Sequence, residues 1–192
     1  MTLLILGLLL FIIPHSLRIF ADDWRGARMA RLGEPAWKGL FSAVVILGFV
    51  LIVWGYGIAR VTPVTLWTPP LWGRHLASLL VLAAFILVAS TYVPRNHIRR
   101  AAGNPMTAGV ALWAVAHLLA NGRLVDLVLF GAFLVWSVLS FLSARQRDRA
   151  AGAVRPPGTL AGDAATLVIG VAAWSLFAFW LHGWLFGVRP FG

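Results

Sequence analysis

The sequence predicts an all-α fold, an integral membrane bundle of about six transmembrane helices. Of the 192 residues, 60% are hydrophobic and 11% are charged, and the mean hydropathy is +0.87. The apolar residues form long runs, which are typical of membrane spans rather than of a soluble core. The 16 Lys and Arg residues gather between these runs. Together these observations favour a membrane protein.

Six apolar runs give the predicted spans, and we expect them to form one domain over residues 1–192. They cover about residues 2–20, 37–60, 75–93, 105–120, 124–142 and 163–187. The fourth run is short, because a span needs roughly 20 residues to cross the hydrocarbon core. The first run has no basic segment before it and no small-residue cleavage site after it. We therefore expect it to be a retained span and not a signal peptide.

The loop charges predict the orientation of the chain. The loops after the first, third and fifth runs, with the edges of the neighbouring runs, carry twelve positive charges, and the opposite side carries four. Because basic loops stay in the cytoplasm, both termini are expected in the periplasm of a bacterial inner (plasma) membrane. Lipid headgroups account for the formal charge of +10, so no nucleic-acid partner is expected. The absence of cysteine excludes a disulfide, a thiolate ligand and a thiol nucleophile.

Two loops have a distinctive composition. The first loop, residues 21–36, is amphipathic, and we expect it to lie along the membrane surface. The fifth loop is rich in Ala, Gly and Pro over residues 150–158, which is typical of a mobile connection.

A candidate functional helix lies in residues 104–122, which open with Asn-Pro and close with Asn-Gly. On a 3.6-residue period, Gly109, Trp113, His117 and Asn121 share one face. Gly109 precedes the histidine by two turns and leaves room for a broad group close to the backbone. Since ionisable groups inside a bilayer are costly, this pattern favours a helix that presents His117 to a heme. A core histidine bonded across to Asn121 or a serine is the alternative.

His15 is the second candidate, because it follows Pro14 in the first span and precedes Arg18 by one turn. It can be read as an axial heme ligand, with Arg18 near a propionate carboxylate. The alternative is an interfacial histidine bonded to a carbonyl that Pro14 frees. His75 and His182 lie near the outer ends of their spans. Two ligands of one iron must lie at a similar depth in the membrane. If His15 and His117 do not, either His75 or His182 becomes a candidate partner for His117.

The other ionisable residues are interpreted as structural. His97 lies in a basic loop and is expected to be solvated. Arg123 and Asp126 are expected to form a local pair three residues apart, with a proton relay through Asp126 as the alternative.

Four segments of the chain resemble the NnrU family of bacterial membrane proteins. They are His15–Arg18, Arg31–Leu40, Arg74–Leu76 and the Asn-Pro to Asn-Gly segment, whose Ala-His-Leu-Leu-Ala-Asn-Gly ending is specific. The resemblance covers nearly the whole chain. The family is in turn distantly similar to 15-cis-zeta-carotene isomerase, a membrane enzyme that uses heme b.

The resemblance implies a six-helix heme-b protein. The isomerase ligates its iron with two histidines, in a His-Ser segment that matches His15 and in a Trp-x-x-Ala-His segment that matches His117. Ala114 stands where the isomerase has a cysteine thought to exchange as ligand, which counts against isomerase activity. Asn104 replaces a histidine that relatives commonly carry.

Three functions remain open from the sequence. The first is a heme-b membrane protein with a redox or gas-related role, which the association of NnrU-type proteins with nitrite and nitric oxide metabolism, and so with denitrification, suggests. The second is a heme-dependent cis–trans isomerase of a carotenoid-like polyene. The third is a membrane assembly or transport component without heme. The expected partners are the lipid bilayer, a small gas or apolar polyene, and a redox partner.

Overall fold

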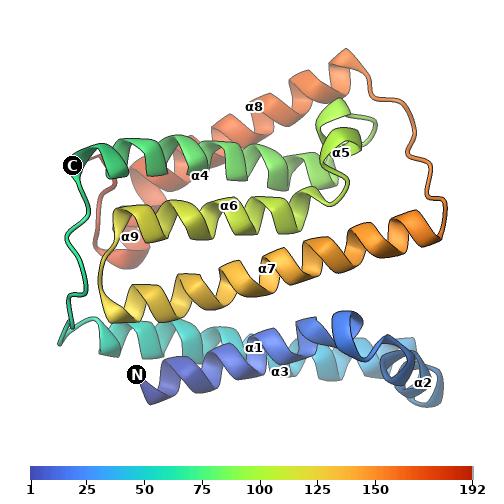
Figure 1. The fold of residues 1–192 in the computed structure, drawn as a ribbon, viewed down its shortest axis with the longest axis horizontal. Helices are drawn as coiled ribbons and strands as arrows, with labels where there is room; N and C mark the ends of the chain where they lie inside the picture. Colours follow the sequence, from blue (N-terminus) through green and yellow to red (C-terminus); the bar gives the residue numbers. More distant parts are fainter. Residues whose placement is uncertain (192) are drawn as a thin grey trace.

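The computed structural model describes residues 1–191, and its regular structure is helical (Figure 1). Within these residues the exception is one isolated bridge between Thr65 and Arg123. The elements are α1 (Thr2–Phe20), α2 (Asp22–Leu32), α3 (Glu34–Ala59), α4 (Leu71–Tyr92), α5 (His97–Ala102), α6 (Pro105–Ala120), α7 (Leu124–Ala150), α8 (Leu160–Leu176), the π-helical turn η1 (Phe177–Leu181) and α9 (His182–Phe186). The predicted all-α fold is therefore confirmed.

Five helical stretches are long and apolar enough to cross a membrane: α1, α3, α4, α7 and the continuous stretch Leu160–Phe186. The sixth predicted span is α6, an apolar helix of 16 residues. At about 1.5 Å per residue it reaches roughly 24 Å, which is less than the hydrocarbon core of about 30 Å. The membrane-spanning bundle is confirmed, and the number of six spans stays a prediction.

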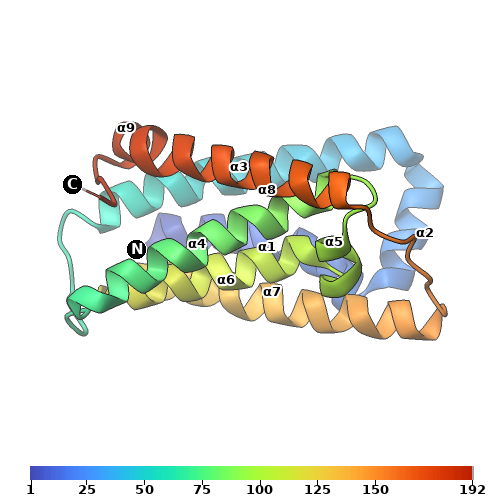
Figure 2. The same ribbon diagram turned by 90° about the horizontal axis from the view of Figure 1, so that it is seen from above.

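The long helices form a row in the order α8, α4, α6, α7, α1 and α3, each in contact with the next. Figure 1 shows this row, and Figure 2 shows that it curves, because α3 and α8 lie on one side and α7 lies on the other. Within the described chain, α3 and α8 make no backbone contact. Arg60 at the end of α3 reaches across and donates to the backbone oxygen of Phe186 at 2.9 Å. The helices α1 and α6, which carry the two candidate histidines, both flank α7.

Glycines bring α1 and α3 into backbone contact. A Cβ atom added to Gly7, Gly48 or Gly55 would lie 2.6, 2.8 or 2.3 Å from a backbone nitrogen of the facing helix. Small residues of this kind let membrane helices pack closely. Their packing fixes the height of α1, and therefore of His15, against α3.

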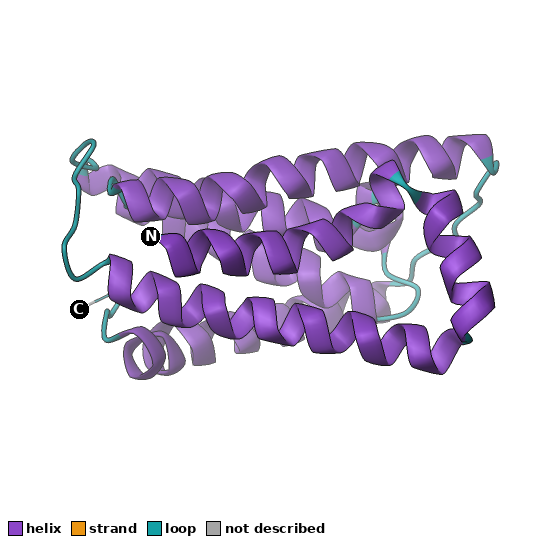
Figure 3. Ribbon diagram, turned by 90° about the horizontal axis from the view of Figure 1, so that it is seen from below, coloured by secondary structure: helices purple, strands orange, loops and turns teal. Residues whose placement is uncertain are grey.

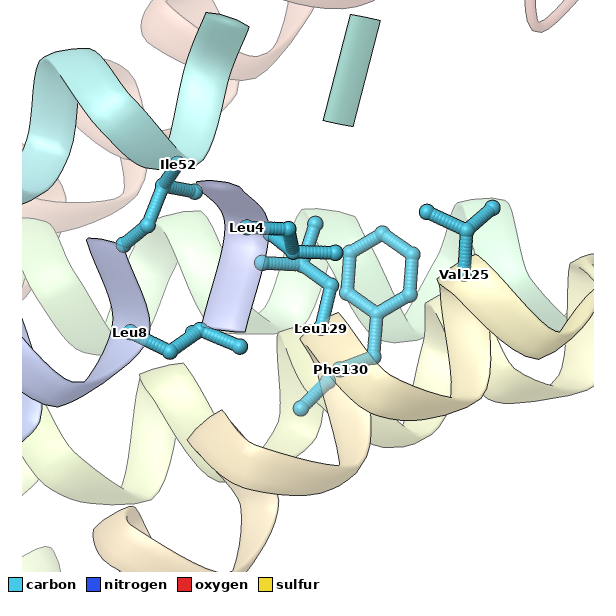
Figure 4. Close-up of a cluster of buried hydrophobic side chains, with 7 residues drawn as sticks. Leu4, Leu8, Ile52, Val125, Leu129 and Phe130 are labelled. Carbon is cyan, nitrogen blue, oxygen red and sulfur yellow. The ribbon is translucent and has the colours of Figure 1, made fainter. Parts of the chain in front are cut away.

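A buried apolar cluster joins four helices (Figure 4). Its members are Leu4 and Leu8 from α1, Ile52 from α3, Ala114 from α6, and Val125, Leu129 and Phe130 from α7. This cluster holds α6 and α7 together beside His117.

The amphipathic first loop forms the short helix α2, which crosses the end of the bundle between α1 and α3 (Figure 3). None of its residues is buried, as a helix at the membrane surface requires. Asp22 accepts a hydrogen bond from Arg25 at 2.8 Å, and this bond lowers the pKa of the Asp22 carboxyl. The start of α1 and the helix α9 both lie at the opposite end of the bundle (Figure 1).

The expectation that His97 is solvated is wrong in part. Although half of its side chain is exposed, its Nδ1 lies 2.7 Å from the Asp163 carboxylate, and its backbone N–H donates to the same group at 2.7 Å. Thr159 also donates from its backbone N–H to Arg95 O at 2.7 Å. The connection before α8 is therefore anchored to the α4–α5 corner. The sequence could not indicate this, because the partners lie more than 60 positions apart.

Candidate functional site

His117 lies at the C-terminal end of α6, facing α7. Its Nδ1 lies 2.9 Å from the backbone oxygen of Trp113. Because a carbonyl only accepts, Nδ1 carries the proton, and the neutral ring keeps its lone pair on Nε2. The imidazole stacks on Phe130 at 4.5 Å between ring centroids, and the indole of Trp113 lies 4.9 Å away. The imidazole bonds to its own helix and not across to another one.

His15 has the same arrangement on α1, where its Nδ1 lies 2.6 Å from the backbone oxygen of Phe11. The carbonyl that loses its helical donor to Pro14 is that of Leu10, four positions earlier. The bond from His15 is therefore not a repair of the proline break. As at His117, the ring nitrogen left with a lone pair is Nε2.

Aromatic side chains from three helices surround the His15 ring. Phe11 stacks on it at 4.5 Å between centroids, Phe41 of α3 lies edge-on at 5.2 Å, and Trp136 of α7 lies edge-on at 5.7 Å. The Nε1 of Trp136 is buried and has no hydrogen-bond partner within residues 1–191. An unpaired buried donor of this kind costs about 1–3 kcal/mol, so an acceptor brought by a bound molecule would be stabilised there.

The two histidines are not in contact with each other. On α7, His117 touches Phe130 and His15 touches Trp136, and six positions of helix separate these contacts by about 9 Å. A series of rings connects the two sites, because Phe133 lies 5.6 Å from Phe11 and 5.7 Å from Trp113. A flat macrocycle held by both histidines requires these rings to turn aside.

The other predicted site residues have different surroundings. Arg18 is exposed, and within residues 1–191 its guanidinium has no carboxylate partner. Asn121 donates from its side chain to the backbone oxygen of His117 at 2.9 Å and so closes the end of α6. Trp113 contributes both the carbonyl and an aromatic wall to His117.

The prediction that Gly109 leaves open space for a broad group is wrong. A Cβ atom at this position would lie 3.0 Å from both the backbone oxygen of Ala84 and a methyl carbon of Val88. Helix α4 therefore occupies the space that we expected a broad ligand to use. Gly109 is a packing position, since small residues allow two membrane helices to approach.

The partner of the buried acid Asp126 differs from the one predicted from the sequence. Asp126 is 1% exposed, and its Oδ1 accepts the Tyr56 hydroxyl of α3 at 2.7 Å. Its Oδ2 accepts the backbone N–H of Arg123 at 3.3 Å, so the expected side-chain ion pair is replaced by a helix cap. A buried carboxylate needs donors, and Tyr56 inside an apolar span was the available signal.

An apolar groove opens between α1 and α7 on the side of Trp136. Its volume is about 430 Å³. The lining residues include Ile12, Ser16, Gly131 and Val135 beside Trp136. The groove therefore lies next to the aromatic surroundings of His15.

Within residues 1–191, no three His, Asp or Glu side chains gather as a group that could hold a bare metal ion. A porphyrin supplies four nitrogens of its own and needs one or two ligands from the protein. The chemistry available at His15 and His117 is therefore that of two separate imidazoles, each with its Nδ1 on a backbone carbonyl.

Comparison with known proteins relates the chain to one family. No curated protein and no solved structure matches it. The family model described as NnrU protein matches residues 3–190, which is nearly the whole chain. The chain therefore belongs to the NnrU family of proteins.

Proposed function

We propose that this protein binds heme b within the bacterial inner membrane, with His15 and His117 as axial ligands, and has a redox or gas-related role. The observation that carries the proposal is the state of the two imidazoles. Each holds its Nδ1 on a carbonyl of its own helix and leaves Nε2 free. Histidine ligands of metals have this arrangement, because the second bond fixes the tautomer and raises the basicity of the coordinating nitrogen.

The residues around the histidines fit the group in their chemistry. Once turned aside, the rings of Phe11, Trp113 and Phe133 would offer apolar faces to a macrocycle. The unpaired Trp136 N–H and the free guanidinium of Arg18 are donors suited to propionate carboxylates.

Two neutral imidazoles would give the bound group a six-coordinate iron suited to electron transfer, or to binding a small gas when one ligand leaves. The link to nitrite and nitric oxide metabolism follows from the family and not from any residue of the site. The basic end of the bundle is expected in the cytoplasm and the termini in the periplasm. A redox partner would then dock on a loop or reach the site from the bilayer.

A visible spectrum of the purified protein tests this proposal. We expect a Soret band, with sharp α and β bands after reduction, and about one heme b per chain. The pyridine derivative identifies the heme type. Absence of these bands, both after expression with a heme precursor and after addition of hemin, would leave a membrane assembly or transport component as the remaining interpretation.

A second candidate function is favoured by the groove between α1 and α7. Its volume is within the range of about 300–1,000 Å³ found for small-molecule sites, its walls are apolar, and it lies next to His15. These features suit a carotenoid-like polyene that enters from the bilayer. The cysteine that the isomerase uses is replaced by Ala114, and this is why we place isomerisation second.

Incubation of the reduced, heme-loaded protein with a cis-carotene, followed by chromatography, tests the isomerase. If the groove binds the polyene, Gly131→Leu fills it and lowers turnover at least about tenfold by misplacing the substrate, while the heme spectrum is unchanged. A Cβ at Gly131 meets its nearest neighbour at 3.9 Å, so the substitution starts without a backbone clash, and Gly131 lines the groove that the leucine would enter. No conversion by the wild-type protein would exclude this function for the substrate used.

A further inference from the structure

The basic end of the bundle contains a cavity that the candidate heme site does not use. It is about 240 Å³ in volume, lies at the end of α7, and is lined by Arg145, Asp148, Arg149 and Arg155 with Gly152 and Ala153. Gly152 has a φ of +58°, a left-handed conformation that glycine adopts without strain. This turn folds the chain back so that Arg155 faces the helix.

Arg155 is fixed by the protein itself, and Arg145 lies close to it. Arg155 forms an ion pair with Asp148 and donates to the backbone oxygen of Gly103 at 3.1 Å. The Arg145 guanidinium also lies beside Gly103, where it would meet an added Cβ at 2.8 Å. The cavity therefore joins α7 to the α5–α6 corner.

The charge of the cavity is not balanced by the protein. The one carboxylate, Asp148, is taken by Arg155. Within residues 1–191, neither Arg145 nor Arg149 has a carboxylate partner. Arginine binds phosphate oxygens through two parallel N–H groups. The cavity thus offers two unpaired guanidinium groups to an anion.

The position of the cavity identifies the source of the anion. Helix α7 has 27 residues, or about 40 Å, and exceeds the hydrocarbon core by roughly 10 Å. Its last turns therefore lie at the level of the lipid headgroups. Val138 and Leu142, 42% and 53% exposed, lie on the same face as Arg145 and Arg149, because these four positions follow a spacing of four, three and four. An apolar track thus leads from the bilayer to the two arginines.

We infer that this cavity is a binding site for the phosphodiester headgroup of an anionic phospholipid, whose acyl chains lie along α7. The volume agrees with a headgroup, because sites for whole ligands occupy about 300–1,000 Å³. A bound phosphate joins Arg145 and Arg149 beside the ion pair of Arg155. It therefore stabilises the junction of α7 with the α5–α6 corner. The inference does not depend on heme binding.

Native mass spectrometry of the full chain with phosphatidylglycerol or phosphatidylcholine tests the site. We expect retained phosphatidylglycerol and a higher unfolding temperature in that lipid. Each of the two guanidinium groups is expected to bond the phosphate directly, so Arg145→Gln with Arg149→Gln should weaken retention at least about tenfold. The double variant Arg28→Gln with Arg31→Gln, which removes two charges from α2 at the same end, should retain the lipid.

Three results would overturn the site. One is equal retention of phosphatidylglycerol by the cavity variant and the α2 variant. Another is equal stabilisation of the wild-type protein by the two lipids. The third is displacement of the lipid by free glycerol phosphate at matched concentration, which would indicate a soluble phosphate compound. Arg149→Lys keeps the charge, and reduced retention by this folded variant would support recognition by the guanidinium fork.

Discussion

Replacing Gly55 by alanine is expected to destabilise the bundle by about 1–3 kcal/mol, the usual cost of forcing extra atoms into a packed interior. The added Cβ would lie 2.3 Å from the backbone nitrogen of Leu4 and 2.8 Å from its Cα. Neither atom belongs to a flexible side chain, so α1 must move away from α3. We expect a lower unfolding temperature in detergent, measured by circular dichroism.

Gly57 supplies the matched control on the same helix. It is exposed, and a Cβ atom at this position meets nothing within 4 Å. Because alanine is a better helix former than glycine, Gly57→Ala should leave the unfolding temperature unchanged or raise it. Equal destabilisation by the two substitutions would contradict the proposed backbone contact and would point to a general effect of glycine on α3.

The fold could be predicted largely from hydropathy, because the bilayer imposes one length and one polarity on every span. The helix over residues 2–20 and the one over residues 105–120 have the predicted bounds. The largest difference is at a basic end, where α7 continues to Ala150 and not to residue 142. Arginine is a good helix former, so the helix outlasts the apolar run. Hydropathy reports where the bilayer ends and not where the helix ends.

The side-chain contacts between different helices could not be predicted from the sequence. The helical period placed Gly109 and His117 on one face of α6. In the structure Gly109 meets α4 whereas His117 meets α7, so the period did not show which neighbour covers each residue. The partner of Asp126 is Tyr56, 70 positions away. Similarly, Phe133 and Trp136 carry no signal in the sequence that distinguishes them from lipid-facing aromatics. Periodicity identifies the residues of one face, whereas the contacts of that face depend on the row of helices.

Alanine at either His15 or His117 is expected to abolish the low-spin heme spectrum. Loss of an outer-shell partner alone costs roughly 10- to 100-fold in metal affinity, so loss of a ligand should cost about 100-fold or more. The two variants should have the same effect, because the proposal assigns both residues to one iron. Absorption spectra of purified protein, with circular dichroism to establish folding, measure the result.

Two other histidines provide controls that distinguish the ligand pair from a general loss of structure. His75 is exposed at the start of α4, and its alanine variant should keep the spectrum. His182 holds its Nδ1 2.7 Å from the backbone oxygen of Val188 and also has a free Nε2. If His182→Ala removes the spectrum while His15→Ala keeps it, the iron lies between α6 and α9. Recovery of the spectrum of His117→Gly with added imidazole would show that the lost group was a ligand, because free imidazole replaces a coordinating nitrogen and not a packing contact.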